Sequence, residues 1–225
     1  CGLGTAVEMN QLSGRKRLVS APLATCLRNE ERVLNSERAR SCGQAIPGVE
    51  VGILDQHGQL LPDRDVGELA VRGPNVMQGY WNKPEQTAEV LQGGWYYTGD
   101  LGFTDDEGYV FLVDRKKDMI VSGGENVYST EVEDVLYRHP EVLEAAVFGV
   151  PDETWGEAVH AVVVPRSDGV SPEELIRHCR DSLGGYKVPK AIELRNEELP
   201  KSGPGKILKR ELRAPYWDHQ DRQIN

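Results

Sequence analysis

Three short stretches of this sequence combine glycine with charged side chains in patterns that could bind phosphate or ribose. They are Tyr97-Thr98-Gly99-Asp100, residues 114–126, and residues 201–206. An Asp after a Gly is ordinarily a turn residue, but the Asp100 carboxylate could also accept hydrogen bonds from a ribose diol. Lys206 follows Gly-Pro-Gly, so a loop could project its ammonium group toward oxygens whose charge grows in a transition state, although an isolated lysine is more commonly a surface residue.

The middle stretch contains a run of basic residues and a glycine pair. Arg115-Lys116-Lys117 would ordinarily be a solvated face, but it lies between two differently patterned units, where a charged junction can act as a hinge. Gly123-Gly124 lacks the other residues of a phosphate-binding P-loop, so the pair by itself indicates only a turn or a close backbone approach.

Residues 43–114 show short β patterns separated by Gly, Asp and Pro turns. We expect one helix from Pro84, with Glu85 near its positive end, to about Gln92. The remaining runs predict a compact, barrel-like β unit, with strands at Val49–Leu54, Glu68–Arg72, Trp95–Thr98 and Tyr109–Val113.

After Asp114 the pattern changes to alternating helices and strands. Thr130 and Glu133 have capping-box spacing at the start of an apolar helical stripe that ends at His139-Pro140. Residues 145–150 and 158–164 are expected as strands. Ser171, Pro172 and Glu174 begin a second helix, which Gly184-Gly185 would end. The pattern predicts helices packed on a small sheet, with Leu175, Ile176, Cys179 and Leu183 on the buried face.

The composition excludes several classes of protein. The 225 residues carry a net charge of −10, which argues against a nucleic-acid surface. No apolar run is long enough for a transmembrane helix, and the first residues lack signal-peptide features, so we expect a cytoplasmic location. Four cysteines, at 1, 26, 42 and 179, show no paired metal spacing and are expected to be reduced structural thiols. Residues 1–42 are highly charged and receive no fold prediction.

Together and in this order, several stretches of residues 43–213 resemble the adenylate-forming superfamily of acyl-CoA synthetases, adenylation domains and luciferases. The stretches that carry the resemblance are residues 73–81, 94–100, 114–128, 149–157, 186–190 and 199–208. The fold class expected is α+β: a small distorted β-barrel subdomain followed by a mobile C-terminal domain of helices on a small β-sheet. Residues 1–42 would end an N-terminal ATP- and acyl-binding domain, 43–114 would be its β-barrel-like subdomain, 115–117 the hinge, and 118–225 the mobile lid domain.

The resemblance implies roles for individual residues. Asp100 and Arg115 would hold the adenosine ribose, and Lys117 falls at the hinge position. Lys206 matches the catalytic lysine that stabilises the carboxylate and α-phosphate during adenylate formation. The remaining implied residues line the coenzyme A and pantetheine site: Gly123, Gly124, Glu125, Trp155 and Tyr186. Trp155 and Tyr186 could equally be packing residues.

The implied reaction joins a carboxylic acid to coenzyme A with ATP and Mg²⁺, through an acyl-AMP intermediate. The sequence of residues 122–128 resembles that of medium- and long-chain fatty-acyl or aryl-CoA ligases more than that of peptide-synthetase domains, which favours a medium- or long-chain fatty acid. The phosphate-binding loop, the acyl pocket and most of the ATP-binding domain have no counterpart here, and no residue is assigned to the metal. The chain alone is therefore expected to be inactive. Two alternatives remain open: an adenylation enzyme that loads a carrier protein, and a non-catalytic binding module that lacks the ATP domain.

Overall fold

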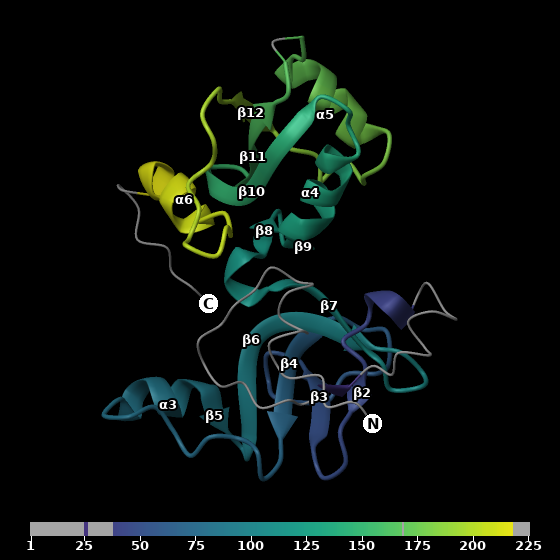
Figure 1. The fold of residues 1–225 in the computed structure, drawn as a ribbon, viewed down its shortest axis with the longest axis vertical. Coiled ribbons are helices and arrows are strands. Elements are labelled where there is room, and N and C mark those ends of the chain that lie inside the picture. Colours follow the sequence, from purple (N-terminus) through teal and green to yellow (C-terminus); the bar gives the residue numbers. More distant parts are fainter. Residues whose placement is uncertain (1–24, 27–37, 168, 218–225) are drawn as a thin grey trace. The chain divides into compact units, whose positions relative to one another are not determined.

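The computed structural model describes residues 25–26, 38–167 and 169–217, which form two compact units (Figure 1). The boundary falls between Lys117 and Asp118. Most of residues 1–42, including Cys1 and the side chain of Cys26, lie outside the described residues. Each unit has its own sheet.

The first unit is built on a curled antiparallel sheet. Its strands are β3 (Glu50–Leu54), β4 (Gly67–Arg72), β5 (Leu91–Gln92), β6 (Trp95–Thr104) and β7 (Val110–Arg115), with β6 at the centre and paired with β4, β5 and β7. This unit also contains a short antiparallel pair of strands, β1 (Thr25–Cys26) and β2 (Gln44–Ala45). Its remaining elements are the 3₁₀ turn η1 (Arg38–Arg40) and helix α3 (Pro84–Val90). The four predicted strands are confirmed, and the long central strand supports the curl that a barrel-like unit requires.

The second unit is a five-stranded sheet with helices on both faces. Its strands are β8 (Ile120–Ser122), β9 (Glu125–Val127), β10 (Val142–Asp152), β11 (Gly156–Pro165) and β12 (Ala191–Leu194), and its helices are α4 (Ser129–Tyr137), α5 (Pro172–Arg180) and α6 (Lys209–Trp217); Figure 1 shows their order. The 3₁₀ turn η2 (Lys116–Asp118) precedes it. β12 is parallel to β11, and the other pairs are antiparallel.

The apolar run in β10 is continuous because both faces of this sheet are buried. Ala145 and Val147 belong to a core that α4 and α5 cover. Ala146 and Phe148 point to the opposite face, where they pack with Leu212 of α6. The predicted α+β fold, a curled β unit followed by helices packed on a small sheet, is thus the observed one.

The two predicted helix starts have different outcomes. The Ser171 hydroxyl accepts a hydrogen bond from the Glu174 N–H at 3.2 Å, as an N-cap should. The capping box at Thr130 and Glu133 is wrong: α4 already begins at Ser129, and its N-cap, Tyr128, makes no side-chain cap. Glu133 is instead used elsewhere, because its carboxylate accepts a hydrogen bond from the Val147 N–H of β10 at 2.8 Å.

The predicted end of the second helix also needs correction. α5 ends at Arg180, and Asp181 caps it, so Gly184-Gly185 lies in the following loop. Leu175 and Cys179 are buried, as predicted, while Ile176 and Leu183 pack at the edge of the same core. α6 and the short strands β8, β9 and β12 were not predicted from the sequence.

Candidate functional site

Asp100 is presented by a bulge in the central strand of the first unit. Between the pairs Glu68↔Leu101 and Ala70↔Tyr97, β4 has one residue and β6 has three, Thr98-Gly99-Asp100. Gly99 has a φ of 71°, in the left-handed region that favours glycine. The Thr98 hydroxyl donates to the Leu69 carbonyl at 2.8 Å and accepts from the Asp100 N–H at 3.1 Å. The motif thus builds the bulge, and each of its residue types has a local structural reason.

The bulge places Asp100 beside Arg115. The two residues are register partners on the antiparallel strands β6 and β7. Arg115 Nε lies 3.8 Å from Asp100 Oδ1, and the side chains are 12% and 21% exposed. An acidic acceptor and a guanidinium donor next to one another form a donor and acceptor set that suits a ribose diol. The structure thus brings these two predicted site residues together.

Glu68 of β4 contacts the neighbours of both Asp100 and Arg115. The sequence did not predict it as a site residue. It is nearly buried, with 9% exposure. One carboxylate oxygen accepts from the Gly99 N–H at 3.1 Å, and the other lies 2.8 Å from Lys116 Nζ. Glu68 therefore fixes the residue before Asp100 and the residue after Arg115. No sequence signal marked it beyond its place in a predicted strand.

The same contact lies at the end of the first unit. Lys116 is tied to Glu68 of the first unit, whereas Asp118 already belongs to the second. Lys117, the predicted hinge residue, is therefore the last residue of the first unit and lies within the 3₁₀ turn η2.

Gly123 and Gly124 form the tight turn between β8 and β9 rather than an extended loop. Their φ values of 61° and 86° are those of a hairpin turn that glycine favours. A Cβ on Gly123 would lie 2.7 Å from the Trp155 ring, and the Gly123 N–H donates to the Trp155 carbonyl at 2.8 Å. Gly124 has nothing within 4 Å of such a Cβ. The backbone therefore approaches the Trp155 ring closely at Gly123 alone.

Two exposed aromatic rings of this unit each have a lysine nearby. Lys190 Nζ lies 5.3 Å from the Trp155 ring centroid, and Lys187 Nζ lies 5.7 Å from that of Tyr186. The rings are 46% and 44% exposed, so neither is a core residue. An exposed aromatic ring beside a cation suits a ligand that has a planar base and phosphates. Lys187 also donates to both carboxylate oxygens of Glu131, at 2.8 Å.

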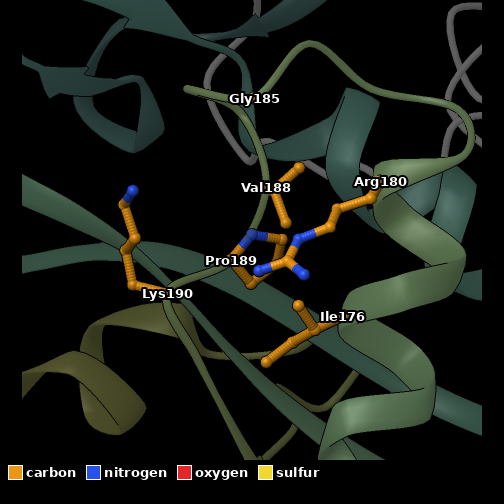
Figure 2. A pocket seen from close by; sticks show the side chains of 6 residues that line it. All are labelled: Ile176, Arg180, Gly185, Val188, Pro189 and Lys190. Carbon is orange, nitrogen blue, oxygen red and sulfur yellow. The ribbon is translucent and has the colours of Figure 1, made fainter.

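A small cavity lies between α5 and the loop that carries Tyr186. Its volume is about 230 Å³, and the lining residues are Ile176, Arg180, Gly185, Val188, Pro189 and Lys190. Figure 2 shows Arg180 extending from the helix toward Pro189 of the loop, with Val188 on one side of it and Ile176 on the other. The two basic side chains make the rim of this cavity cationic.

Lys206 follows a closed loop whose turn is Ser202-Gly203-Pro204-Gly205. The Ser202 N–H donates to the Lys206 carbonyl at 2.8 Å, and the Gly205 N–H donates to the Ser202 carbonyl at 2.7 Å. The Ser202 hydroxyl accepts from the Lys206 N–H at 3.2 Å. Lys201 and Ile207 form a bridge at the base of the loop.

The predicted site residues therefore lie in four separate places. Asp100 and Arg115 belong to the first unit with Lys117, whereas Gly123, Gly124, Glu125 and Trp155 lie around the β8–β9 hairpin of the second. Tyr186 and Lys206 lie in two further loops of the second unit.

In the part of the chain that the structure describes, no group of three His, Cys, Asp or Glu side chains could hold a metal ion. No helix among the described residues is long and apolar enough to cross a membrane.

Comparison with known proteins relates this chain to one enzyme family. The model of the AMP-binding enzyme family matches residues 20–81, and that of the AMP-binding enzyme C-terminal domain matches residues 131–206. A long-chain-fatty-acid–CoA ligase of Yersinia pestis is 51% identical over 77% of this chain and 31% of its own length. A feruloyl-CoA synthase of Amycolatopsis is 48% identical over 83% of this chain and 38% of its own length.

A solved structure agrees with these relatives. The o-succinylbenzoate CoA synthetase of Bacillus subtilis, in complex with its acyl-adenylate intermediate, is 38% identical, with a TM-score of 0.75 over 84% of this chain and 38% of that one. The chain thus spans about a third of the length of the proteins that it resembles. The two family models, the relatives and the fold agree, and the chain belongs to the adenylate-forming superfamily of AMP-binding enzymes.

Proposed function

We propose that this chain supplies the C-terminal part of an ATP-dependent, AMP-forming acid–CoA ligase. The observation that carries the proposal is the Asp100–Arg115 pair, which a dedicated bulge presents at the end of the first unit. The pair offers a carboxylate acceptor and a guanidinium donor for the adenosine ribose. The relatives that the chain resembles include ligases for a long-chain fatty acid and for 2-succinylbenzoate, as well as a feruloyl-CoA synthase.

In the proposed reaction, a carboxylate attacks the α-phosphate of ATP and releases pyrophosphate. The thiolate of coenzyme A then attacks the acyl-AMP carbonyl and displaces AMP. Mg²⁺ would neutralise phosphate charge and would be held by the rest of the protein. We assign to Lys206 the stabilisation of charge that develops on the carboxylate and α-phosphate oxygens during the first step. The Ser202–Gly205 turn, which closes on the Lys206 backbone, supports this assignment.

The second step would use the other surface of the C-terminal unit. We propose that rotation about Lys117 exchanges the Lys206 loop for the β8–β9 hairpin, whose Gly123, Gly124 and Glu125 would line the pantetheine tunnel. Trp155 and Tyr186, each exposed beside a lysine, would contact the nucleotide of coenzyme A. The Lys116–Glu68 contact supports a hinge after Lys116, because it ties that residue to the first unit.

The proposed acid is a medium- or long-chain fatty acid. Relatives that use aromatic acids match the chain almost as well, so the acid is decided by experiment on the complete protein. Fatty, aryl and dicarboxylic acids would be offered with ATP and coenzyme A, and AMP release would be measured. A carrier protein would be offered in place of coenzyme A, and acyl transfer to the carrier alone would replace the ligase proposal with a carrier-loading one.

The half-reactions of the complete protein test the role of Lys206. We expect Lys206→Ala to slow adenylate formation by about 100-fold or more, since loss of one such charge-stabilising group has effects of this size. Transfer from supplied acyl-AMP to coenzyme A should stay within about threefold, because that step does not use the lysine. Arg210→Ala is the matched control, since Arg210 is an exposed cation close in sequence. Equal losses in both half-reactions for Lys206→Ala would contradict the assignment.

A further inference from the structure

The Lys206 loop orders its own turn, and its tip is exposed to solvent. Gly203, Pro204 and Gly205 are all exposed. Hydrogen bonds among Ser202, Gly205 and Lys206 order the turn itself. The segments where the chain enters and leaves the loop can set the direction of the loop relative to the sheet.

At the entry side, Glu144 of β10 holds two consecutive parts of the chain. Its carboxylate accepts a hydrogen bond from the Leu199 N–H at 2.9 Å and forms an ion pair with Lys201. The Glu144 side chain is 15% exposed. Burial alone would raise the pKa of Glu144, but the hydrogen bonds from Lys201 and Leu199 outweigh it and lower the pKa. Glu144 therefore carries its charge where the loop begins.

At the exit side, Lys209 is held by α4. Its ammonium group lies 2.6 Å from Glu133 Oε1 and donates to the Ser129 hydroxyl at 2.8 Å. Both members of the ion pair are largely buried, at 18% and 15% exposure. Glu133 is itself fixed, because the same oxygen accepts the N–H of Val147 on the edge strand β10.

We propose that Glu144 and Glu133 are positioning residues that clamp the two ends of the Lys206 loop. Each carboxylate binds a backbone N–H, which orients it, and a lysine next to the loop, which it orients in turn. The clamp would hold Lys206 in the geometry that adenylate formation requires, and this consequence rests on the function proposed above. Neither carboxylate would touch substrate.

Amide hydrogen exchange in the complete protein tests the clamp without using activity. We expect Glu144→Ala to speed exchange at Ser202, Gly205 and Lys206 by about 10-fold or more, the scale of a lost hydrogen bond to a charged group. Glu144→Gln should have a smaller effect, because its amide oxygen can still accept from Leu199. Lys209→Met should loosen the exit end in the same way while leaving the Glu133–Val147 bond in place.

The matched control is Tyr216→Phe, which removes a hydrogen bond from the far end of α6, where the Tyr216 hydroxyl donates to Glu193. It should leave exchange in the loop unchanged. The clamp would be refuted if Glu144→Ala left loop exchange at the wild-type rate. It would also be refuted if exchange accelerated equally throughout β10 and β11, which would be general destabilisation.

In the complete protein, Glu144→Ala should slow adenylate formation about 10-fold or more and leave transfer from supplied acyl-AMP within about threefold. Equal losses would refute its positioning role in catalysis. Lys206→Ala, measured in parallel, separates the two proposals. If that variant shows no selective loss, the function assigned to Lys206 fails, and the exchange data alone decide whether the clamp exists.

Discussion

Asp100 and Arg115 lie opposite one another on antiparallel strands, with Arg115 Nε 3.8 Å from Asp100 Oδ1. The separation is longer than a hydrogen bond, and both side chains retain some exposure. We expect Asp100→Asn to weaken binding of AMP to the complete protein by about 10- to 100-fold, the loss of a hydrogen bond to a charged acceptor. Isothermal titration calorimetry would measure this affinity.

Asp106→Asn is the control for that experiment. Asp106 also belongs to the first unit and also faces an arginine, Arg64, but both side chains are well exposed, at 75% and 65%. Its substitution should leave AMP affinity unchanged. An equal loss in the two variants would indicate a general charge effect and would contradict a ribose contact at Asp100.

Glu68 should matter for the same affinity although it lies behind the pair. Glu68→Gln keeps an acceptor for the Gly99 N–H but loses the charge that holds Lys116. We expect this variant to bind AMP a few-fold more weakly, and Glu68→Ala about 10-fold more weakly, because the bulge then loses a bond to a charged group. Unchanged affinity in Glu68→Ala, with the variant folded by circular dichroism, would contradict a bracing role.

The longer strands of the two sheets could be predicted because their apolar patterns are bounded by turn residues. Residues 145–150 of β10 and 161–164 of β11 are continuous apolar runs, since both faces of their sheet are covered. β8, β9 and β12 have only three or four residues, and their neighbours stabilise them more than their own sequence does. α6 gives little signal because Leu212 is its one buried residue and Pro215 lies inside it.

The candidate site divides in a similar way. The motif residues Asp100, Arg115 and Lys206 were found because each stands in a short, recognisable string. The carboxylates that position them were not, because their partners are distant in sequence: Glu68 is 31 residues from Gly99, and Glu144 is 55 residues from Leu199. Glu133 was noticed for its spacing from Thr130, but its interpretation was wrong because tertiary contacts with Val147 and Lys209 replace the local cap.

The hairpin turn offers two glycines that separate backbone strain from side-chain contact. Both have positive φ, but only Gly123 faces the Trp155 ring. We expect Gly124→Ala to lower the free energy of unfolding by about 1–2 kcal/mol, the cost of a left-handed residue. Gly123→Ala should cost more, because its methyl group also meets the ring. Urea denaturation would measure the free energy of unfolding of each variant, with and without an added Trp155→Ala substitution. The additional loss of stability in Gly123→Ala, relative to Gly124→Ala, should vanish when the Trp155 ring is absent.

Cys179 should be nearly inert toward alkylating reagents. It is fully buried among α5 and its core neighbours, and burial raises the pKa of its thiol to about 11. At pH 8 only about one thiol in a thousand would then be a reactive thiolate. Cys42 is partly exposed and provides the comparison within the same chain. Iodoacetamide labelling followed by peptide mass spectrometry should modify Cys42 long before Cys179, and equal rates without denaturant would contradict the buried placement.

His160 should make the second unit less stable in mild acid. Its ring is buried beside Phe148 and Tyr216, and burial lowers its pKa despite the nearby Glu193, with Arg195 lowering it further. The unfolded chain, with an ordinary histidine pKa of about 6.5, then binds a proton that the folded chain resists. The stability that the neutral His160 ring contributes is fully present above pH 6.5. It is lost as the pH falls toward the lowered pKa that His160 has in the folded chain. We expect urea denaturation midpoints to decrease between pH 7.5 and 5.5, and to decrease less in His160→Gln.

His57→Gln, at an exposed turn of the first unit, is the control and should retain the full decrease. The same pH dependence in His160→Gln as in the unmodified chain would show that another group is responsible.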